Sequence, residues 1–140
     1  MKPFQLHPKL ANDCFILGKL TFSQVLLMNN AALPWFILVP ETPCLELCDL
    51  PPPQQLQLLE EINAISHYIQ HQHPGYKLNV AMIGNIVQQL HVHVVGRNPT
   101  DYCWPQVVWG HPISQHYAAE QIPPLVAKLK TYLGAAFQPI

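Results

Sequence analysis

The sequence has few charged residues, and this scarcity narrows the classes of partner it can have. Asp, Glu, Lys and Arg make up 11% of the 140 residues, and the formal net charge is −1. The seven basic residues are scattered, so no basic stretch is present that would bind nucleic acid or acidic lipid. Because 49% of the residues are apolar, we expect a compact globular chain with no nucleic-acid partner.

Long apolar runs and paired cysteines are also missing. No run reaches the roughly 18 residues of a membrane span, and the N-terminal stretch MKPFQLHPKL lacks the apolar core of a signal peptide. We therefore expect a cytoplasmic protein with no membrane partner. The four cysteines contain no C-x-x-C pair, which favours free thiols over a disulfide framework or a metal clip.

No repeat, low-complexity tract or linker divides the chain, so we expect a single domain over residues 1–140. Five short stretches rich in aliphatic and aromatic residues predict strands. These predicted strands are 14–20, 22–28, 35–39, 76–84 and 89–95. The short turns between neighbouring stretches favour antiparallel pairing.

Two further segments have the periodicity of helices. The first follows DLPPP and ends at Pro74-Gly75, and a second helix is predicted from about Pro123. The apolar positions at helical spacing in the first are Leu56, Leu59, Ile62, Ile65 and Ile69. The order of elements predicts an α+β fold, a five-stranded antiparallel sheet with two main helices.

The stretch VQQLHVHVVGR, residues 87–97, places two histidines two positions apart in an apolar segment. Residues i, i+2 and i+4 of a strand share a face, so Gln89, His91 and His93 are expected to form one polar row. The apolar residues between them would then point into the core. Two imidazoles roughly 6–7 Å apart at the backbone can both touch one phosphate-sized group.

Three interpretations of this row compete. It is a half-exposed strand with a polar outer face, or a metal site, or a nucleophilic histidine with helpers. For the metal site, His67, His71 and His73 are the other candidates, but they lack the spacing of a known ligand set. For the third, a neutral imidazole is nucleophilic near pH 7 and can take a phosphoryl-type group covalently.

The residues on either side of the row favour the third interpretation. Gly84 and Asn85 precede it, and a glycine turn lets backbone amides approach an anion. Arg97 follows it and is the only arginine in the chain. Its role is a surface ion pair, a phosphate contact or a support for the end of the strand.

With these flanks, the row resembles the signature of the histidine-triad (HIT) family, His-φ-His-φ-His-φ-φ, where φ is apolar. Here the signature reads QLHVHVV over residues 89–95, preceded by Gly84-x-x-Val87 and followed by Gly96-Arg97. The order of elements also fits, and the resemblance covers nearly the whole chain. It is most similar to a bacterial branch with Q-L-H-V-H and a following W-P-x-x-V-W-G, residues 104–110 here.

The resemblance implies an antiparallel sheet with helices packed on it, usually in a homodimer, and a purine nucleotide or nucleotide conjugate as partner. Family members hydrolyse, or transfer from, bonds at the α-phosphate, and neither a cofactor nor a metal is expected. His91 would attack the phosphorus to give a nucleotidyl-histidine, and His93 would bind the phosphate oxygens. Gln89, at the first histidine position, could position phosphate or leaving group but cannot act as a general acid.

Other positions bear on the substrate. Ile86 stands where many relatives have a hydroxyl that would face phosphate. Asn29 is the candidate for the ribose hydroxyls and Asn30 the runner-up, with turn roles equally compatible. Trp104 and Trp109 either wall the nucleotide pocket, line a dimer contact or pack in the core.

The leading prediction is an enzyme acting on a dinucleoside polyphosphate or a nucleoside phosphoramidate through His91. The alternative is a nucleotide-binding module with little or no turnover, which Gln89 and Ile86 favour. A third hypothesis is a metal-dependent enzyme in which His91 and His93 are ligands.

Overall fold

The computed structural model describes residues 2–140, which form a six-stranded antiparallel sheet in the order β4-β5-β3-β2-β1-β6. The strands are β1 (Cys14–Lys19), β2 (Ser23–Met28), β3 (Trp35–Pro40), β4 (Lys77–Ala81), β5 (Val92–Arg97) and β6 (Gln138–Pro139). The predicted α+β fold with an antiparallel sheet is confirmed, but the predicted number of five strands is wrong.

The additional strand, β6, is two residues long and pairs with β1 at the edge of the sheet. Gly18 of β1 makes this pairing possible, because a Cβ there would collide with the carbonyl of Gln138 and the ring of Phe137. A strand this short, with a proline in it, has no alternating pattern by which it could be predicted.

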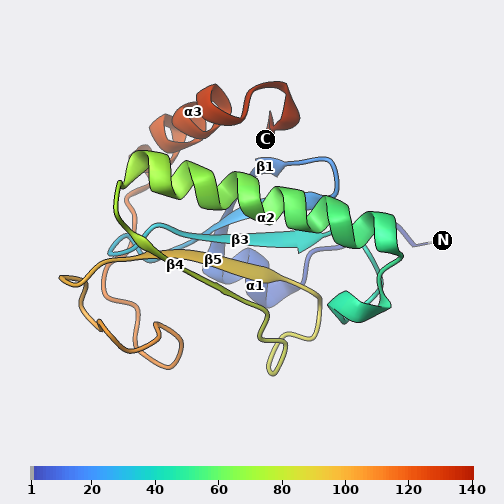
Figure 1. Ribbon diagram of the computed structural model, residues 1–140, viewed down its shortest axis with the longest axis horizontal. Helices are drawn as coiled ribbons and strands as arrows, with labels where there is room; N and C mark the ends of the chain where they lie inside the picture. Colours follow the sequence, from blue (N-terminus) through green and yellow to red (C-terminus); the bar gives the residue numbers. More distant parts are fainter. Residues whose placement is uncertain (1) are drawn as a thin grey trace.

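The helices are α1 (Pro8–Asp13), α2 (Pro52–Gln72) and α3 (Ile122–Leu133). Single turns of 3₁₀ helix are η1 (Leu47–Asp49), η2 (Ala119–Gln121) and η3 (Gly134–Ala136). The helices α2 and α3 cover one face of the sheet, and α1 lies behind the other (Figure 1). The two predicted helices are confirmed. Within residues 2–140, no helix combines the length and apolar character needed to cross a membrane.

The long helix α2 buries a different stripe from the one predicted. Ile65 and Ile69 are fully buried as expected, but Leu56 and Leu59 are 63% and 51% exposed. Glu61 is buried in the stripe, and its carboxylate accepts the backbone N–H of Phe22 at 2.8 Å. A pattern that counts only apolar residues cannot place a stripe that contains a hydrogen-bonded carboxylate.

Alternation along the central strand β3 divides the core into two layers. Phe36 packs with the layer under α2 and α3, whereas Trp35 packs with the layer on the opposite face. The neighbouring strand β5 divides in the same way, because Ile37 of β3 pairs with His93 and Phe36 pairs with Val94. His93 therefore lies on the face away from the two long helices.

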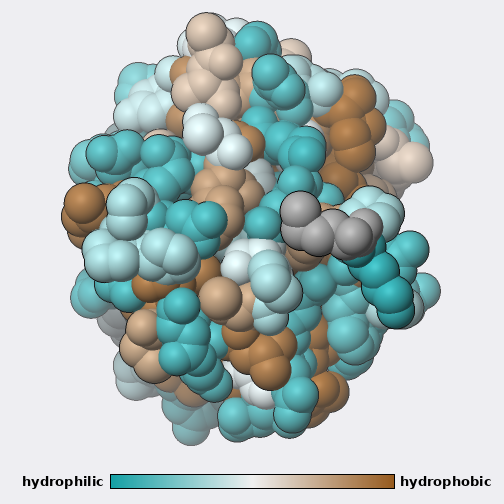
Figure 2. Space-filling model, turned by 90° about the vertical axis from the view of Figure 1, so that its right-hand side faces the viewer, coloured by the Kyte–Doolittle hydropathy of each residue, from teal (hydrophilic) through white to brown (hydrophobic). Residues whose placement is uncertain are grey.

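The outer surface is mixed in character. The face seen in Figure 2 alternates hydrophilic and hydrophobic residues, and no single apolar area covers it. This agrees with a composition in which charged residues are scarce and uncharged polar residues supply much of the hydrophilic surface.

Candidate active site

The two histidines of the motif lie side by side at the start of β5. The strand begins at Val92, so the expected strand over residues 89–95 is displaced, and His91 belongs to the irregular chain before it. The two imidazole centroids are nevertheless 5.0 Å apart, and both side chains are buried. The two rings are therefore neighbours, and of the two only His91 lines the cavity described below.

The backbone fixes which nitrogen of His91 carries the proton. Its Nδ1 lies 2.7 Å from the carbonyl oxygen of Gln89. A carbonyl can only accept, so Nδ1 is the protonated nitrogen and Nε2 of the neutral ring keeps a free lone pair. Within residues 2–140 this Nε2 has no hydrogen-bond partner. The ring is thus held in the tautomer that a nucleophile requires.

His93 is held in the opposite tautomer. The indole Nε1–H of Trp35, which can only donate, is 3.0 Å from Nδ1 of His93. In the neutral ring the proton must therefore lie on Nε2, which makes this nitrogen a donor. Burial, together with the charge of neighbouring His91, lowers the pKa of His93 to about 3, so the ring stays neutral at physiological pH.

A cavity of about 150 Å³ opens beside His91. Gly84, a predicted phosphate-binding residue, lines it, and so does Gln88, which was not predicted. Glu46 and Met82 also line it, and sequence reasoning missed both because they come from the chain before α2 and the end of β4. The space is sized for a small group beside the His91 ring.

Gln89 has a structural use that the motif did not indicate. Its Oε1 accepts the backbone N–H of His7 at 2.8 Å, and its Nε2 donates to the carbonyl of Gln5 at 2.9 Å. Both ends of the amide are therefore engaged by the N-terminal segment that leads into α1. Gln89 also lines the cavity beside His91. Its amide has a second N–H beyond the one donated to Gln5, so the predicted contact with phosphate or leaving group is compatible with these bonds and stays a prediction.

Replacing Gln89 with Ala is expected to loosen the N-terminal segment. Two hydrogen bonds would be lost, which lowers the free energy of unfolding by about 1–2 kcal/mol. Denaturant unfolding measures this change, and hydrogen exchange should show faster exchange of the His7 amide. Gln88→Ala is the matched control, because Gln88 is exposed and makes no hydrogen bond within residues 2–140. Equal effects of the two substitutions would contradict the assignment.

Three asparagines of the predicted binding set lie elsewhere. The Asn29 side chain accepts the backbone N–H of Tyr117 at 2.8 Å, and buried Asn30 donates to the hydroxyl of Tyr102 at 3.1 Å. Asn85 is exposed and, unlike Gly84, does not line the cavity beside His91. Contacts of these three side chains with ribose or phosphate stay predictions. In the structure, Asn29 and Asn30 hold loops in place.

Arg97 supports the end of β5. Its side chain is 1% exposed, and Nε and Nη2 donate to both oxygens of Asp101 at 2.8 and 3.0 Å. Nη1 donates to Asn79 of β4 at 3.0 Å, and Nη2 also reaches the carbonyl of Gln106 at 2.8 Å. Because each nitrogen already has a protein acceptor, the predicted phosphate contact is not the role this structure gives it. The predicted surface ion pair is also wrong, because the ion pair that Arg97 forms with Asp101 is buried.

The two tryptophans of W-P-x-x-V-W-G differ in their surroundings. Trp109 packs edge-on against Trp35, with centroids 6.2 Å apart, and its ring centroid is 5.3 Å from that of His93. Trp104 is 37% exposed, and the guanidinium of Arg97 lies 5.8 Å from its ring centroid. Packing is the role that these contacts support.

The other histidines form no cluster with each other. His71 packs near Tyr132, with centroids 5.1 Å apart, and His73 stacks on Tyr76 at 4.7 Å. In the part of the chain that the structure describes, no three His, Cys, Asp or Glu side chains are placed to share a metal ion.

An α+β fold with an antiparallel sheet, and a histidine pair at the start of one of its inner strands, is the architecture of the HIT domain. The model of that domain matches residues 9–100. The chain therefore belongs to the histidine-triad (HIT) family, as the motif and its flanks predict. Members of this family are generally nucleotide-binding proteins that act as hydrolases or transferases.

Several solved structures are similar over nearly their whole length. A histidine triad protein from Marinobacter aquaeolei VT8 is 41% identical, with a TM-score of 0.90 and coverage of 96% of this chain and 99% of that chain. One from Bradyrhizobium japonicum is 36% identical, with a TM-score of 0.88 and coverage of 94% and 98%. One from Sinorhizobium meliloti 1021 is 34% identical, with a TM-score of 0.88 and coverage of 92% and 96%. None of the curated proteins compared with the chain matches it.

Proposed function

We propose that this protein hydrolyses a purine nucleotide conjugate, or transfers from it, at the α-phosphate, with His91 as the nucleophile. The observation that carries the proposal is the 2.7 Å hydrogen bond from Nδ1–H of His91 to the carbonyl of Gln89. This bond leaves the lone pair of Nε2 available beside a cavity, in a ring that is buried against water.

In the first step, Nε2 of His91 attacks the α-phosphorus. A nitrogen–phosphorus bond forms and the bond from phosphorus to the leaving group breaks, so the electron pair of that bond goes to the leaving group. The leaving group takes its proton from solvent, because an amide such as Gln89 has none to give at neutral pH. The Nε2–H of His93, held in place by Trp35, donates to a phosphate oxygen as charge develops.

In the second step, water attacks the same phosphorus and releases one proton to solvent, and the nitrogen–phosphorus bond breaks. The electron pair of that bond returns to Nε2 of His91, and a nucleoside monophosphate leaves. An acceptor other than water would give transfer instead of hydrolysis. Two displacements through an imidazole avoid direct attack on the conjugate by water, which is a weak nucleophile.

We also propose a homodimer in which the sheet continues across the two subunits. The support is β4, which lies at one edge of the sheet and has an unpaired side. Val80 and Met82, in and just after this strand, are 45% and 42% exposed. Sedimentation equilibrium should give twice the mass of the chain, and a monomer at all concentrations tested would contradict this assembly.

The function is tested with diadenosine tetraphosphate and adenosine 5′-phosphoramidate as substrates. We expect release of AMP and, after rapid acid-free quenching, a mass increase of one adenylyl group on the peptide that contains His91. Calorimetry with AMP distinguishes the alternative. Binding of AMP without product from either substrate would favour a binding module, and turnover without an adduct on His91 would contradict the covalent route.

A further inference from the structure

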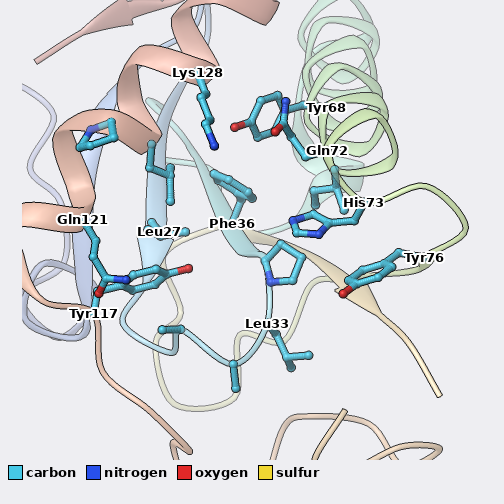
Figure 3. Close-up of a pocket in the computed structure, with 16 residues that line it drawn as sticks. Leu27, Leu33, Phe36, Tyr68, Gln72, His73, Tyr76, Tyr117, Gln121 and Lys128 are labelled. Atoms are coloured by element: carbon cyan, nitrogen blue, oxygen red, sulfur yellow. The ribbon is translucent and has the colours of Figure 1, made fainter. Parts of the chain in front are cut away.

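A second and larger cavity, of about 550 Å³, lies between α2, α3 and the loop that joins β2 to β3 (Figure 3). It is on the face of the sheet that the long helices cover, since Phe36 and Leu27 of the helix-side layer line it. The histidine pair lies on the other face, and no residue lines both cavities. The proposed nucleotide chemistry therefore leaves this cavity unused.

The floor and walls of this cavity suit a planar apolar group. Phe36 and Tyr68 meet edge-on at 5.8 Å, and the rings of Tyr117, Tyr76 and His73 complete the walls. Aromatic side chains pack well against another ring in edge-on or offset geometry. The volume lies within the roughly 300–1,000 Å³ of typical small-molecule sites.

One positive charge enters the cavity without a counter-charge. The Lys128 side chain extends from α3 into the space (Figure 3), and within residues 2–140 its ammonium has no hydrogen-bond or ion-pair partner. None of the sixteen lining residues is Asp or Glu. An anionic group is therefore the complement that this site lacks.

A phenol hydroxyl without a protein partner reinforces the choice of an anion. Tyr68 is 4% exposed, yet its hydroxyl makes no hydrogen bond to any described residue and lies on the side of the cavity where Lys128 enters (Figure 3). Burial raises the pKa of Tyr68 and, with the charge of Tyr68, that of Tyr117, so both hydroxyls stay protonated as donors at neutral pH. The Tyr68 hydroxyl is not one of the fully buried unpaired atoms, so it reaches the cavity and can donate to a ligand there.

We propose that this cavity binds a small organic acid with a single carboxylate and a planar apolar body. The carboxylate is held by the Lys128 ammonium and the Tyr68 hydroxyl, and the planar body lies over Phe36 and Leu27. The single positive charge of Lys128 balances the single negative charge of a carboxylate, and the phenol hydroxyls can donate hydrogen bonds to its oxygens. The site lies across the sheet from His91 and is independent of the nucleotide reaction.

The test is an NMR titration of the full chain with phenylacetate, and with phenylacetamide as the uncharged counterpart. We expect phenylacetate to bind with a dissociation constant of about 1 mM or tighter and to shift the Phe36 amide and the His73 ring. Burial and the Lys128 charge lower the pKa of His73, so a bound carboxylate should raise it. Phenylacetamide should bind at least about tenfold more weakly.

Two variants separate the site from general charge effects. Lys128→Gln and Tyr68→Phe should each weaken phenylacetate binding about tenfold, whereas Lys2→Gln removes a lysine that does not line the cavity and should leave binding unchanged. The proposal is overturned if phenylacetate causes no shifts, if phenylacetamide binds equally well, or if the shifts map beside His91 instead. It is also overturned if Lys128→Gln binds as well as the unchanged protein.

Discussion

The His91→Ala variant is expected to release AMP from adenosine 5′-phosphoramidate about 10⁴-fold more slowly than the unchanged protein. Alanine removes the Nε2 lone pair, which no other side chain can replace, because Nδ1 of His93 is occupied by the Trp35 indole. The hydrogen bond to Gln89 is lost as well, so folding is checked by thermal unfolding. Steady-state assays of AMP release measure the effect.

A matched histidine shows whether the loss is specific. His116 is exposed and makes no hydrogen bond within the described chain, so His116→Ala should retain full activity. In His91→Ala, AMP should still bind, since Gly84 and His93 remain, and no adenylyl adduct should form. Activity near the unchanged level in a folded His91→Ala protein would contradict the nucleophile assignment.

Much of the sheet could be predicted because its strands alternate or are apolar and end at clear turns. The first three strands, for example, differ from their predicted bounds by one residue at most. The order of the strands could not be predicted in the same way. The contact of β3 with β5 brings residues 35 and 93 together across a stretch that includes the whole of α2, and only the folded sheet reveals it.

The reactive residues of the site could be predicted from the sequence, but the hydrogen-bond partners that position the residues around them could not. The H-x-H spacing brings His91 and His93 close together, and the structure confirms that their rings are neighbours. The partner of Gln89 lies more than eighty positions away in the N-terminal segment, where no pattern marks it. The sequence left three roles open for Arg97, and only the structure shows that Asp101, four residues later, pairs with the buried guanidinium.

The role of Trp35 as the hydrogen-bond donor to His93 could not be predicted from the sequence. Its substitution by Phe tests how His93 acts. Phe retains most of the packing but removes the Nε1–H that donates to Nδ1 of His93 at 3.0 Å. The proton of the neutral ring can then move to Nδ1, which leaves Nε2 without a hydrogen for the phosphate oxygen. Because one such bond is worth about 1 kcal/mol, we expect kcat to fall about fivefold.

The same bond contributes to keeping His93 uncharged, because a donor at Nδ1 leaves no room for a second proton there. Burial, followed by the charge of His91, lowers its pKa to about 3, and Trp35→Phe should raise this pKa because a donor that favours the neutral ring is lost. The control for both effects is Trp109→Phe. Trp109 also packs beside His93, but its Nε1 has no protein partner. Imidazole ¹⁵N shifts report tautomer and pKa in both variants. If both variants change kcat and the His93 tautomer equally, lost packing rather than the lost donor is the cause. A difference confined to Trp35→Phe identifies the indole N–H as the group that orients the His93 donor.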